Sequence, residues 1–456
     1  MIYIYCPWCY ATGGTELLHQ LGYTLNLLGF EASMIYYEAG KKNGPVMHPH
    51  FEKYHVPVLE EIVPSDDAVV ILPEPMAKHM SDICTQVPFG TKVLWWLSVD
   101  GAELSKEDEA ALSKNTDVVH MVQSYYAKDY VCRRIGVPEE KILYLSDYIN
   151  SMFLNVKNDL PRENVVLINP RKGFERTSQL IMKSNADICW KVLNEIVPSD
   201  VPEILSRAKV YIDFGNHPGK DRFPREAAAC GCRIITGKRG AAAFHGDVPI
   251  PEELKFDDDA PDKQILEMIY VLIKNYEASG ELFKDYIDFI KEEFHSFESD
   301  VFSIFHSLTN TPIRISKESS SSKEALSEYV MERFSEGDFK QAFYGITLYR
   351  KLGFEETSVL LALEIYTRLG VEDFYIAEYL ADRLAGIETE NYEAYLLRAQ
   401  AILGQPGAVK RTSQIISDID KALSLSSGTE DEQEVGRRAQ ALVELMRSVI
   451  PELNEV

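Results

Sequence analysis

The sequence predicts an α/β protein in which two Rossmann-like domains face each other across a cleft and an all-helical domain follows them. Short, continuously apolar segments alternate with helical patterns in two successive series, which is typical of buried parallel strands joined by helical crossovers. A polar, serine-rich segment at 317–323 follows the second series. Beyond it only helical patterns occur, and they repeat.

The first series occupies the first third of the chain. Strands are predicted at 1–5, 32–37, 68–72, 92–97, 117–123 and 142–145, and helices at 16–29 and 125–135. Right-handed crossovers would place these strands in one parallel sheet. We therefore predict a first Rossmann-like domain at residues 1–158.

The second series has the same alternation. Strands are predicted at 164–169, 187–191, 209–214 and 232–236, and helices at 174–184, 201–208 and 225–230. Pro224 stands at the start of the last of these helices, a position that proline favours. The pattern is helical from 262 to about 306. We predict a second Rossmann-like domain with trailing helices at residues 159–310.

The rest of the chain is predicted to be a serine-rich linker at 311–324 and a helical domain at 325–456. Phe339 and Ala342 recur as Phe374 and Ala377, and the segment 361–370 is echoed at 395–404. A two-helix repeat of about 34 residues is the period of tetratricopeptide repeats. The sequence therefore predicts TPR-like helical hairpins.

Length, charge and hydropathy exclude several classes of protein. A chain of 456 residues exceeds the size of one hydrophobic core. Its formal net charge of −24 argues against a general nucleic-acid binder or a binder of anionic membranes. No apolar run has the roughly 20 residues of a membrane span, and the N-terminus lacks a signal-peptide pattern. We expect a cytoplasmic protein.

Cys6-Pro7-Trp8-Cys9 is similar to the redox dithiol of a glutaredoxin. A reactive dithiol needs its first cysteine at a helix N-terminus. Gly13 and Gly14 are costly inside a helix, so the helix is predicted to begin at Thr15. No second Cys/His pair lies nearby, and the seven cysteines do not form a disulfide framework. We expect Cys6 and Cys9 to be packing residues.

A cluster of basic residues is predicted at one mouth of the second domain. Loops that follow three of its strands carry Arg171, Lys172, Lys220, Arg222, Arg225, Lys238 and Arg239. In open α/β sheets, ligands bind at the carboxyl ends of the strands. Pyrophosphate fits such a cluster, and we expect three or four of the seven side chains to face the cleft. Gly13 and Gly14 would let the first domain approach the same phosphates.

These features together resemble GT-B glycosyltransferases, in particular the retaining enzymes of family 4. The segment from Arg134 to Ile142, with Gly-Val-Pro and Lys-Ile, is similar to the end of their first domain. Arg171-Lys172-Gly173 is similar to their phosphate-binding loop. Arg225-Glu226-Ala227 to Gly231 is similar to the helix whose glutamate binds the nucleotide ribose. The resemblance covers roughly residues 1–300.

One position departs from the pattern of that family. A second glutamate usually stands eight positions before Glu226, and here Pro218 occupies that position. We therefore take His217, Lys220 and Asp221 as the candidate catalytic residues. The resemblance implies transfer of a sugar from a nucleotide-diphosphate sugar to an acceptor hydroxyl, with retention and without a metal or cofactor. Cationic side chains would offset the charge on the leaving diphosphate.

The acceptor is expected to bind the first domain, where Trp96, Ser98 and Asp100 end a strand. Because Trp95 and Trp96 point to opposite sides of that strand, at least one belongs to the core. The helical domain suggests a protein partner or a homo-oligomer. A protein acceptor such as a bacterial adhesin, flagellin or S-layer protein, or a surface glycan, fits a transferase with such a domain.

Two other functions remain open at this stage. A catalytically inactive GT-B subunit or chaperone would explain Pro218, whereas Glu226 and the basic cluster argue against it. A thiol oxidoreductase would use Cys6 and Cys9, and the position of the predicted helix argues against it.

Overall fold

The computed structural model describes residues 1–8, 10–37, 47–156, 161–194 and 196–450. The chain divides into two compact units. One consists of Met1–Asn26 and Phe30–Pro312, and the other of Leu27–Gly29 and Ile313–Val456. The first unit holds both β-sheets. The boundary predicted between residues 158 and 159 lies outside the described residues.

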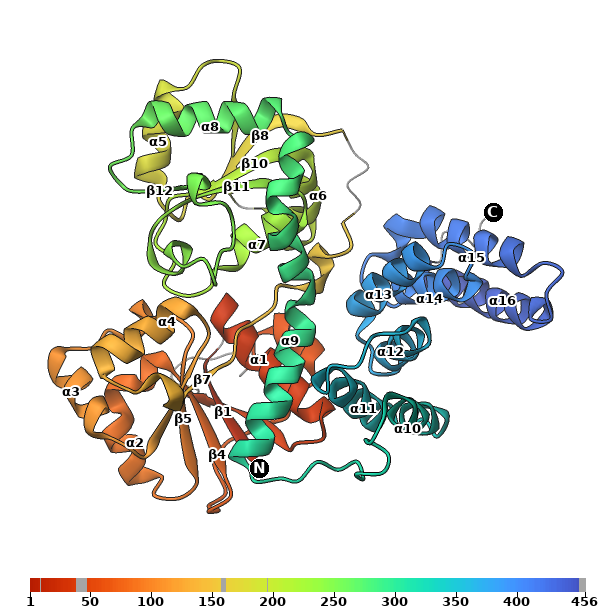
Figure 1. Ribbon diagram of the computed structural model, residues 1–456, viewed down its shortest axis with the longest axis horizontal. Helices are drawn as coiled ribbons and strands as arrows, with labels where there is room; N and C mark the ends of the chain where they lie inside the picture. The colour runs from red at the N-terminus through yellow and green to blue at the C-terminus, as the bar shows by residue number, and fades with distance from the viewer. Residues whose placement is uncertain (9, 38–46, 157–160, 195, 451–456) are drawn as a thin grey trace. The chain divides into compact units, whose positions relative to one another are not determined.

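A seven-stranded sheet forms the first half of the first unit (Figure 1). Its strands are β1 (Ile2–Pro7), β2 (Ala32–Tyr37), β3 (Val58–Leu59), β4 (Val69–Pro73), β5 (Thr91–Trp96), β6 (Val118–Val122) and β7 (Ile142–Tyr144). All neighbours are parallel, in the order β3-β2-β1-β4-β5-β6-β7. The central strands are continuously apolar because helices cover both faces of such a sheet.

Among the described residues, four α-helices connect these strands. They are α1 (Gly13–Leu27), α2 (Met80–Gln86), α3 (Lys106–Lys114) and α4 (Tyr125–Tyr130). The prediction that α1 begins at Thr15 was wrong by two residues. Thr12 and Thr15 exchange hydrogen bonds between their backbone N–H groups and hydroxyls, at 2.8 and 3.2 Å, and so organise the first turn around the two glycines. Glycine costs little there because the first N–H groups of a helix make no intrahelical bond.

A five-stranded sheet forms the second half of the unit. Its strands are β8 (Glu163–Ile168), β9 (Cys189–Val192), β10 (Ala208–Asp213), β11 (Arg233–Gly237) and β12 (Lys255–Phe256). They are parallel, in the order β12-β11-β10-β8-β9. The accompanying helices are α5 (Phe174–Lys183), α6 (Val201–Arg207), α7 (Arg222–Ala229), α8 (Asp262–Lys274) and α9 (Lys284–Leu308).

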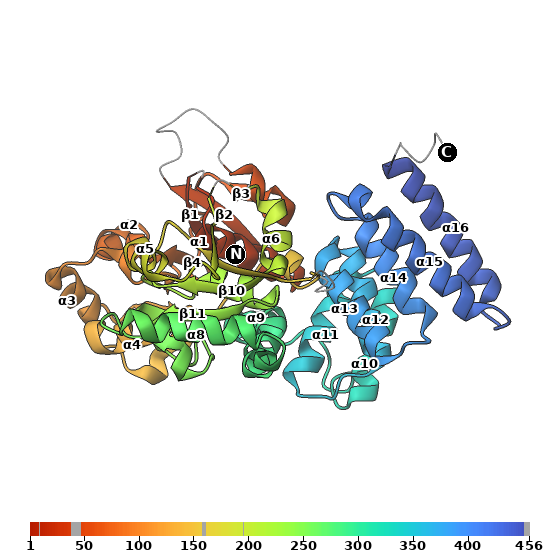
Figure 2. The same cartoon turned by 90° about the horizontal axis from the view of Figure 1, so that it is seen from above.

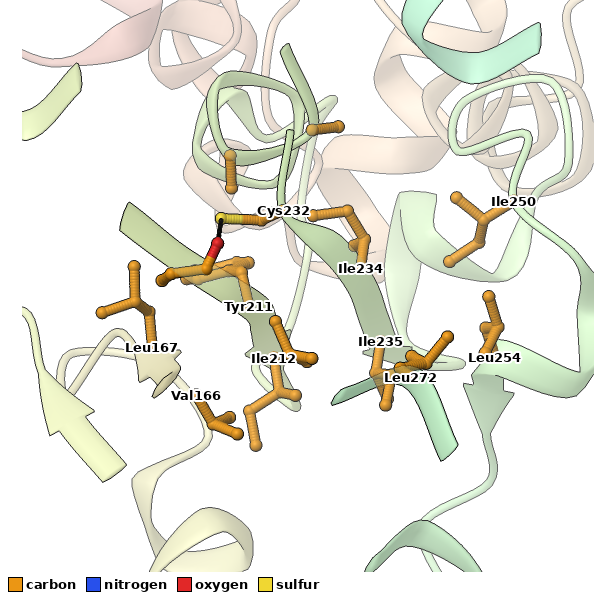
Figure 3. Close-up of a cluster of buried hydrophobic side chains, with 14 of the residues drawn as sticks. Val166, Leu167, Tyr211, Ile212, Cys232, Ile234, Ile235, Ile250, Leu254 and Leu272 are labelled. Carbon is orange, nitrogen blue, oxygen red and sulfur yellow. Dashed lines mark hydrogen bonds between the residues drawn. The ribbon is translucent and has the colours of Figure 1, made fainter. Parts of the chain in front are cut away.

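The core of this second half joins the strands to the helices that cover them, including Ile269 and Leu272 of α8. Figure 3 shows Val166, Tyr211, Ile212, Ile234 and Ile235 among the buried side chains of neighbouring strands. In the same cluster the Cys232 thiol donates to the Leu205 carbonyl oxygen at 3.2 Å. Cys232 is thus a buried free thiol that belongs to the core.

Helix α9 connects the two halves of the first unit. It carries Glu293, whose carboxylate lies 2.7 Å from Arg225 of the second half. Farther along, the ring of Phe305 lies 6.4 Å from that of Phe30, which follows α1. The helix therefore packs against both halves, and Figure 1 shows α9 running along them.

The second unit is helical, and its consecutive helices pack side by side (Figure 2). They are α10 (Lys323–Ser335), α11 (Phe339–Lys351), α12 (Ser358–Gly370), α13 (Phe374–Ile387), α14 (Tyr392–Leu403), α15 (Thr412–Ser426) and α16 (Glu432–Val449). The two parallel sheets and this helical part confirm the predicted fold class.

The sequence repeat corresponds to a repeated contact. A Cβ atom added to Gly370, at the end of α12, would lie 2.6 Å from the ring of Phe339, at the start of α11. One added to Gly404, which follows α14, would lie 2.4 Å from the ring of Phe374, at the start of α13. Each hairpin therefore closes with an aromatic ring against a glycine. The more specific TPR-like assignment stays a prediction. None of the described helices is long and apolar enough to cross a membrane.

Candidate functional site

A cavity of about 800 Å³ lies between the two halves of the first unit. Its walls are the segments that follow β1, β4, β5 and β7 of the first sheet and β8 and β10 of the second. These are carboxyl ends of parallel strands, where α/β folds bind their ligands. The volume is that of a site for a small molecule.

Direct contacts join the two walls around this cavity. The Val99 N–H donates to the Pro218 carbonyl oxygen at 2.7 Å. A Cβ atom on Gly219 would lie 2.1 Å from the Leu97 carbonyl oxygen, so only glycine fits there. The Asp247 carboxylate accepts from the Tyr125 N–H at 2.8 Å and caps α4. The second half thus contributes a cap to a helix of the first.

The N-terminus of α1 lies on the cavity. Thr12, Gly13, Gly14 and Thr15 are among the lining residues. An ideal Cβ atom on Gly13 would lie 3.5 Å from the Arg222 side chain. The helix has 15 residues, and its positive end is suited to an anion. The structure thus places the predicted glycine pair at the cavity.

Three of the seven predicted basic residues line the cavity, namely Lys172, Lys220 and Arg222. Arg225 lies beneath it and is 1% exposed. Arg171 is exposed and outside the lining, where its N–H group donates to the Asn169 side chain. Arg171 and Arg225 were also candidates for donor binding, and they are among the four that do not line the cavity.

Lys238 and Arg239, which follow β11, are the other two basic residues outside the cavity lining. Lys238 lies 3.5 Å from Glu252, and Arg239 lies 2.6 Å from Asp258. Neither residue lines the cavity. Acidic residues on both sides of β12 hold these cations away from it.

The cations at the cavity belong to a buried chain of alternating charges. In order, the buried ion-pair chain is Lys220, Glu293, Arg225, Asp147, Arg222 and Glu16. The successive contacts are 2.7, 2.7, 2.7, 3.1 and 2.6 Å long. Three cations thus alternate with three carboxylates, and Lys53 lies a further 3.2 Å from Glu16. Most of the positive charge of the predicted basic mouth is therefore already paired.

Glu16 and Asp147 stay ionised within this chain. Burial raises the pKa of the Glu16 carboxyl, but Arg222 beside it holds that pKa well below its usual range. Burial likewise opposes ionisation of Asp147, and Arg225 and Arg222 together lower its pKa. These opposite charges favour the charged forms by more than burial disfavours them.

His217 is a buried positioning residue rather than a wall of the cavity. Its imidazole is 1% exposed and lies between two carboxylates. Nδ1 is 2.9 Å from Asp221 Oδ2, and Nε2 is 3.6 Å from Asp213 Oδ1. His217, predicted to be catalytic, does not line the cavity, whereas its neighbour Asp221 does.

Lys172 completes this arrangement at the cavity surface. Its ammonium group contacts the Asp221 carboxylate, and both side chains line the cavity. At the other end, the Tyr211 hydroxyl donates to Asp213 Oδ2 at 3.0 Å. The row of contacts therefore runs from the core of the second half to one partly exposed lysine.

The same group has donor atoms that could hold a metal ion. One ligand atom each from Asp213, His217 and Asp221 lies within 4.8 Å of the others. The Lys172 ammonium already neutralises Asp221 there. A divalent cation at this position would lie close to that ammonium group.

Glu226 lies in the second turn of α7 and lines the cavity. Burial raises the pKa of its carboxyl to about 7, although Arg222 acts in the opposite direction. Glu226 is therefore an uncharged or partly charged hydrogen-bonding group near neutral pH.

Of the residues predicted for the acceptor side, only Ser98 lines the cavity. Trp96 is fully buried, and its indole N–H donates to His120 Nδ1 at 3.1 Å. Trp95 is also fully buried, because both faces of the sheet are covered. Asp100 accepts from the Asn216 side-chain amide and lies outside the cavity lining. The predicted roles of Trp96 and Asp100 at an acceptor were therefore wrong.

Several functional candidates escaped the sequence reasoning. Glu74 directly follows the apolar strand β4, and Asp147 follows β7 by three residues. A polar residue just after a buried strand was the available signal. His48 and His50 also line the cavity. No local pattern marks Glu293, since it lies within a long helix.

Cys6 is a buried packing residue, as expected from the sequence. Cys6 is 1% exposed, and burial raises the pKa of its thiol well above the ordinary value. The thiolate, which is the nucleophile, is therefore disfavoured. Cys9 lies outside the described residues.

No protein-family model matches the chain, and no curated protein has a similar sequence. Sucrose-phosphate synthase from Thermosynechococcus elongatus has a similar solved structure, with a TM-score of 0.51 and 14% identity. The match covers 68% of this chain and 99% of that one. At this identity it shows the fold alone, which is GT-B.

Two further solved structures match with lower scores. The lipopolysaccharide outer core galactosyltransferase WaaB has a TM-score of 0.48 at 11% identity, over 67% of this chain and 100% of its own. A glycosyltransferase from Rickettsia africae has a TM-score of 0.45 at 11% identity, and the match covers 68% of this chain and 99% of that one. Neither adds to the fold assignment.

Proposed function

We propose that the protein is a glycosyltransferase that moves a sugar from a nucleotide-diphosphate sugar to an acceptor hydroxyl. The observation that supports this proposal is the composition of the cavity in a GT-B fold. One wall contains the N-terminus of α1 with Gly13 and Gly14, and the other contains Lys172 and Glu226. A helix N-terminus and a lysine suit a diphosphate, and a carboxyl group suits the hydroxyls of a ribose.

The roles of the residues in the donor site depend on which cationic side chains can contact a diphosphate. Lys172 is the lysine nearest to solvent among those that line the cavity, and its side chain is 34% exposed. Together with the helix N-terminus at Gly13 and Gly14, Lys172 stabilises the negative charge that develops on the leaving diphosphate. Lys220 and Arg222 are committed to Glu293, Asp147 and Glu16, and they shape the floor of the site. Asp221 holds Lys172 in place.

The finer features of the reaction follow the resemblance to family 4. We propose retention at the anomeric carbon and a reaction without a metal ion. The acceptor is a protein or a surface glycan, and the helical unit binds that protein or a second copy of the chain. The enzyme acts in the cytoplasm, where nucleotide sugars are its donors.

A titration with donors tests this proposal. We expect at least one member of a panel of UDP-, GDP-, ADP- and TDP-sugars to bind with micromolar to millimolar affinity by calorimetry. Lys172→Ala should weaken that binding by about tenfold, the effect of losing one charge-assisted hydrogen bond. Lys263→Ala is the matched control, because Lys263 is an exposed lysine of α8. Absence of binding to every donor would refute the assignment.

A further inference from the structure

Glu16 places a carboxylate beside the N-terminal end of α1. It stands in the first turn of that helix, two residues after Gly14, and it lines the cavity. An ideal Cβ atom on Gly13 would lie 3.5 Å from the Arg222 side chain, and Arg222 Nη1 lies 2.6 Å from Glu16 Oε2. One arginine therefore contacts both the glycine pair and the carboxylate. A diphosphate at Gly13 and Gly14 would bind close to this negative charge.

Each nitrogen of the Arg222 guanidinium already has an acceptor. Nη1 donates to Glu16 at 2.6 Å, Nη2 donates to Gln20 at 2.8 Å, and Nε donates to Asp147 at 3.1 Å. All three acceptors belong to the first half of the unit. The positive charge of Arg222 is therefore shared between two carboxylates before any ligand binds.

Three further groups surround the Glu16 carboxylate, and all belong to the 3-10 turn Pro49–Tyr54. The Tyr54 hydroxyl donates to Oε1 at 2.8 Å, while Lys53 Nζ lies at 3.2 Å and His50 Nε2 at 3.7 Å from the same oxygen. The Lys53 and His50 side chains are each 43% exposed, so water and salt screen their charges. Burial raises the pKa of Glu16, but its cationic neighbours hold that pKa well below the usual range, and the carboxylate stays charged.

The proposed donor and its product differ in the charge of the terminal phosphate. In a nucleotide-diphosphate sugar this phosphate is esterified by the sugar. The nucleoside diphosphate that leaves has a free terminal phosphate, whose second pKa is about 6, so it carries about one more negative charge at neutral pH. A unit charge about 10 Å away changes affinity by roughly tenfold at an effective dielectric constant of about 20. One carboxylate beside the phosphates is therefore sufficient to distinguish the two ligands.

We propose that Glu16 determines specificity in the donor site by disfavouring the free nucleoside diphosphate relative to the intact nucleotide sugar. The carboxylate repels the extra charge on the free terminal phosphate more strongly than it repels the esterified phosphate of the donor. The product then leaves the site more readily and competes less with the next donor molecule. This inference rests on the proposed function, in which Gly13 and Gly14 contact the diphosphate.

Calorimetry with two ligands of different charge tests this inference on the full chain. The probes are the nucleoside diphosphate of the donor that the panel identifies and its terminal methyl ester, which has the charge of a nucleotide sugar but no sugar. The original protein should bind the free diphosphate no more tightly than the ester. Glu16→Gln removes the charge and keeps the shape, so this variant should bind the free diphosphate about tenfold more tightly than the ester. Because the readout is a ratio of two affinities, a loss of stability that affects both ligands equally cancels.

Lys53→Gln is a second variant, for which the opposite result is expected. Lys53 is partly exposed, and its removal leaves the charge of Glu16 less neutralised. The ester should then bind about threefold more tightly than the free diphosphate, a smaller effect because an exposed charge is screened. Glu109→Gln is the matched control, since Glu109 accepts from Tyr130 and Arg134 at 3.0 Å outside the cavity lining. It should leave the ratio unchanged.

Two outcomes would overturn the inference. One is a free diphosphate that binds the original protein about tenfold more tightly than its ester does. The other is an affinity ratio that neither Glu16→Gln nor Lys53→Gln changes. If thermal unfolding shows that Glu16→Gln does not fold, the ratio measured for Lys53→Gln decides the question. A protein that binds neither the nucleoside diphosphates nor the donors would instead contradict the proposed function.

Discussion

Arg222 of α7 and Glu16 of α1 form an ion pair of 2.6 Å between the two halves of the first unit. Both side chains are 11% exposed. Arg222 also donates to Gln20 Oε1 at 2.8 Å, so it reaches two successive turns of α1. A residue that the sequence assigns to a diphosphate therefore joins the two walls of the cavity.

Breaking this pair should destabilise the first unit. Stripping one partner from a buried ion pair costs about 3–5 kcal/mol. The cost of Glu16→Gln should be smaller, since Arg222 keeps Asp147. We expect a lower melting temperature for Glu16→Gln and for Arg222→Met, and a double variant that loses less than the sum. Additive losses in the double-mutant cycle would show that the pair is not coupled.

The buried imidazole of His217 should act through Lys172. His217→Ala leaves Asp221 without its partner at 2.9 Å, so Asp221 and Lys172 lose their fixed orientation. We expect weaker donor binding, by about the tenfold assigned to one charge-assisted hydrogen bond. In a double variant with Lys172→Ala, His217→Ala should weaken donor binding little beyond the effect of Lys172→Ala alone. A large further loss of affinity in the double variant would place His217 in contact with the ligand instead.

Chelation should not affect donor binding. Asp213, His217 and Asp221 could offer ligands to a metal, but the Lys172 ammonium occupies Asp221. We therefore expect equal donor affinity by calorimetry with EDTA and with added Mn²⁺. A donor affinity that requires Mn²⁺ and disappears in His217→Ala would identify a metal centre there.

Glu226 should make stability depend on pH. Its pKa is about 7 in the folded protein against 4.5 ordinarily, so between these values the folded state keeps a proton that the unfolded state has lost. Stability therefore falls as pH rises through this window, at up to about 1.4 kcal/mol per unit.

Glu226→Gln should remove this contribution. We expect the variant to gain stability relative to the original protein between pH 5 and pH 7, as measured by urea denaturation. Below pH 4.5 the two should converge apart from a constant offset. A parallel pH dependence of both proteins would show that Glu226 ionises normally.

The helical unit should be sensitive at its aromatic-glycine contacts. Gly404→Val would force a side chain against Phe374, and overpacking of this kind costs about 1–3 kcal/mol. Gly386→Ala, on α13, is the matched control because nothing lies within 4 Å of its added Cβ atom. We expect a lower melting temperature only for Gly404→Val, and unchanged donor binding in both. Equal melting temperatures would contradict the packing.

Some features follow from the sequence because they depend on local patterns. Continuous apolar segments such as those of β4 and β10 predicted two parallel sheets, and the repeat of Phe339 at Phe374 predicted the helical unit. The loops after β8 and β10 were likewise expected at the cavity. Parallel topology brings strand ends together whatever their exact partners are.

Which cations face a ligand depended on the tertiary structure. Arg225 and Lys238 look alike in sequence, yet one is buried against Asp147 and the other lies outside the cavity against Glu252. Their acidic partners lie 78 and 14 positions away, respectively, and no local pattern links them.

The properties of Glu74 likewise depend partly on local sequence and partly on tertiary structure. The sequence alone predicted an apolar strand at 68–72, and Glu74 stands just after it, because a strand is a local pattern. Only the tertiary structure brought Leu97 and Gly101 around it and raised its pKa by burial. The charge state of a side chain depends on its whole surroundings, and folding determines those surroundings.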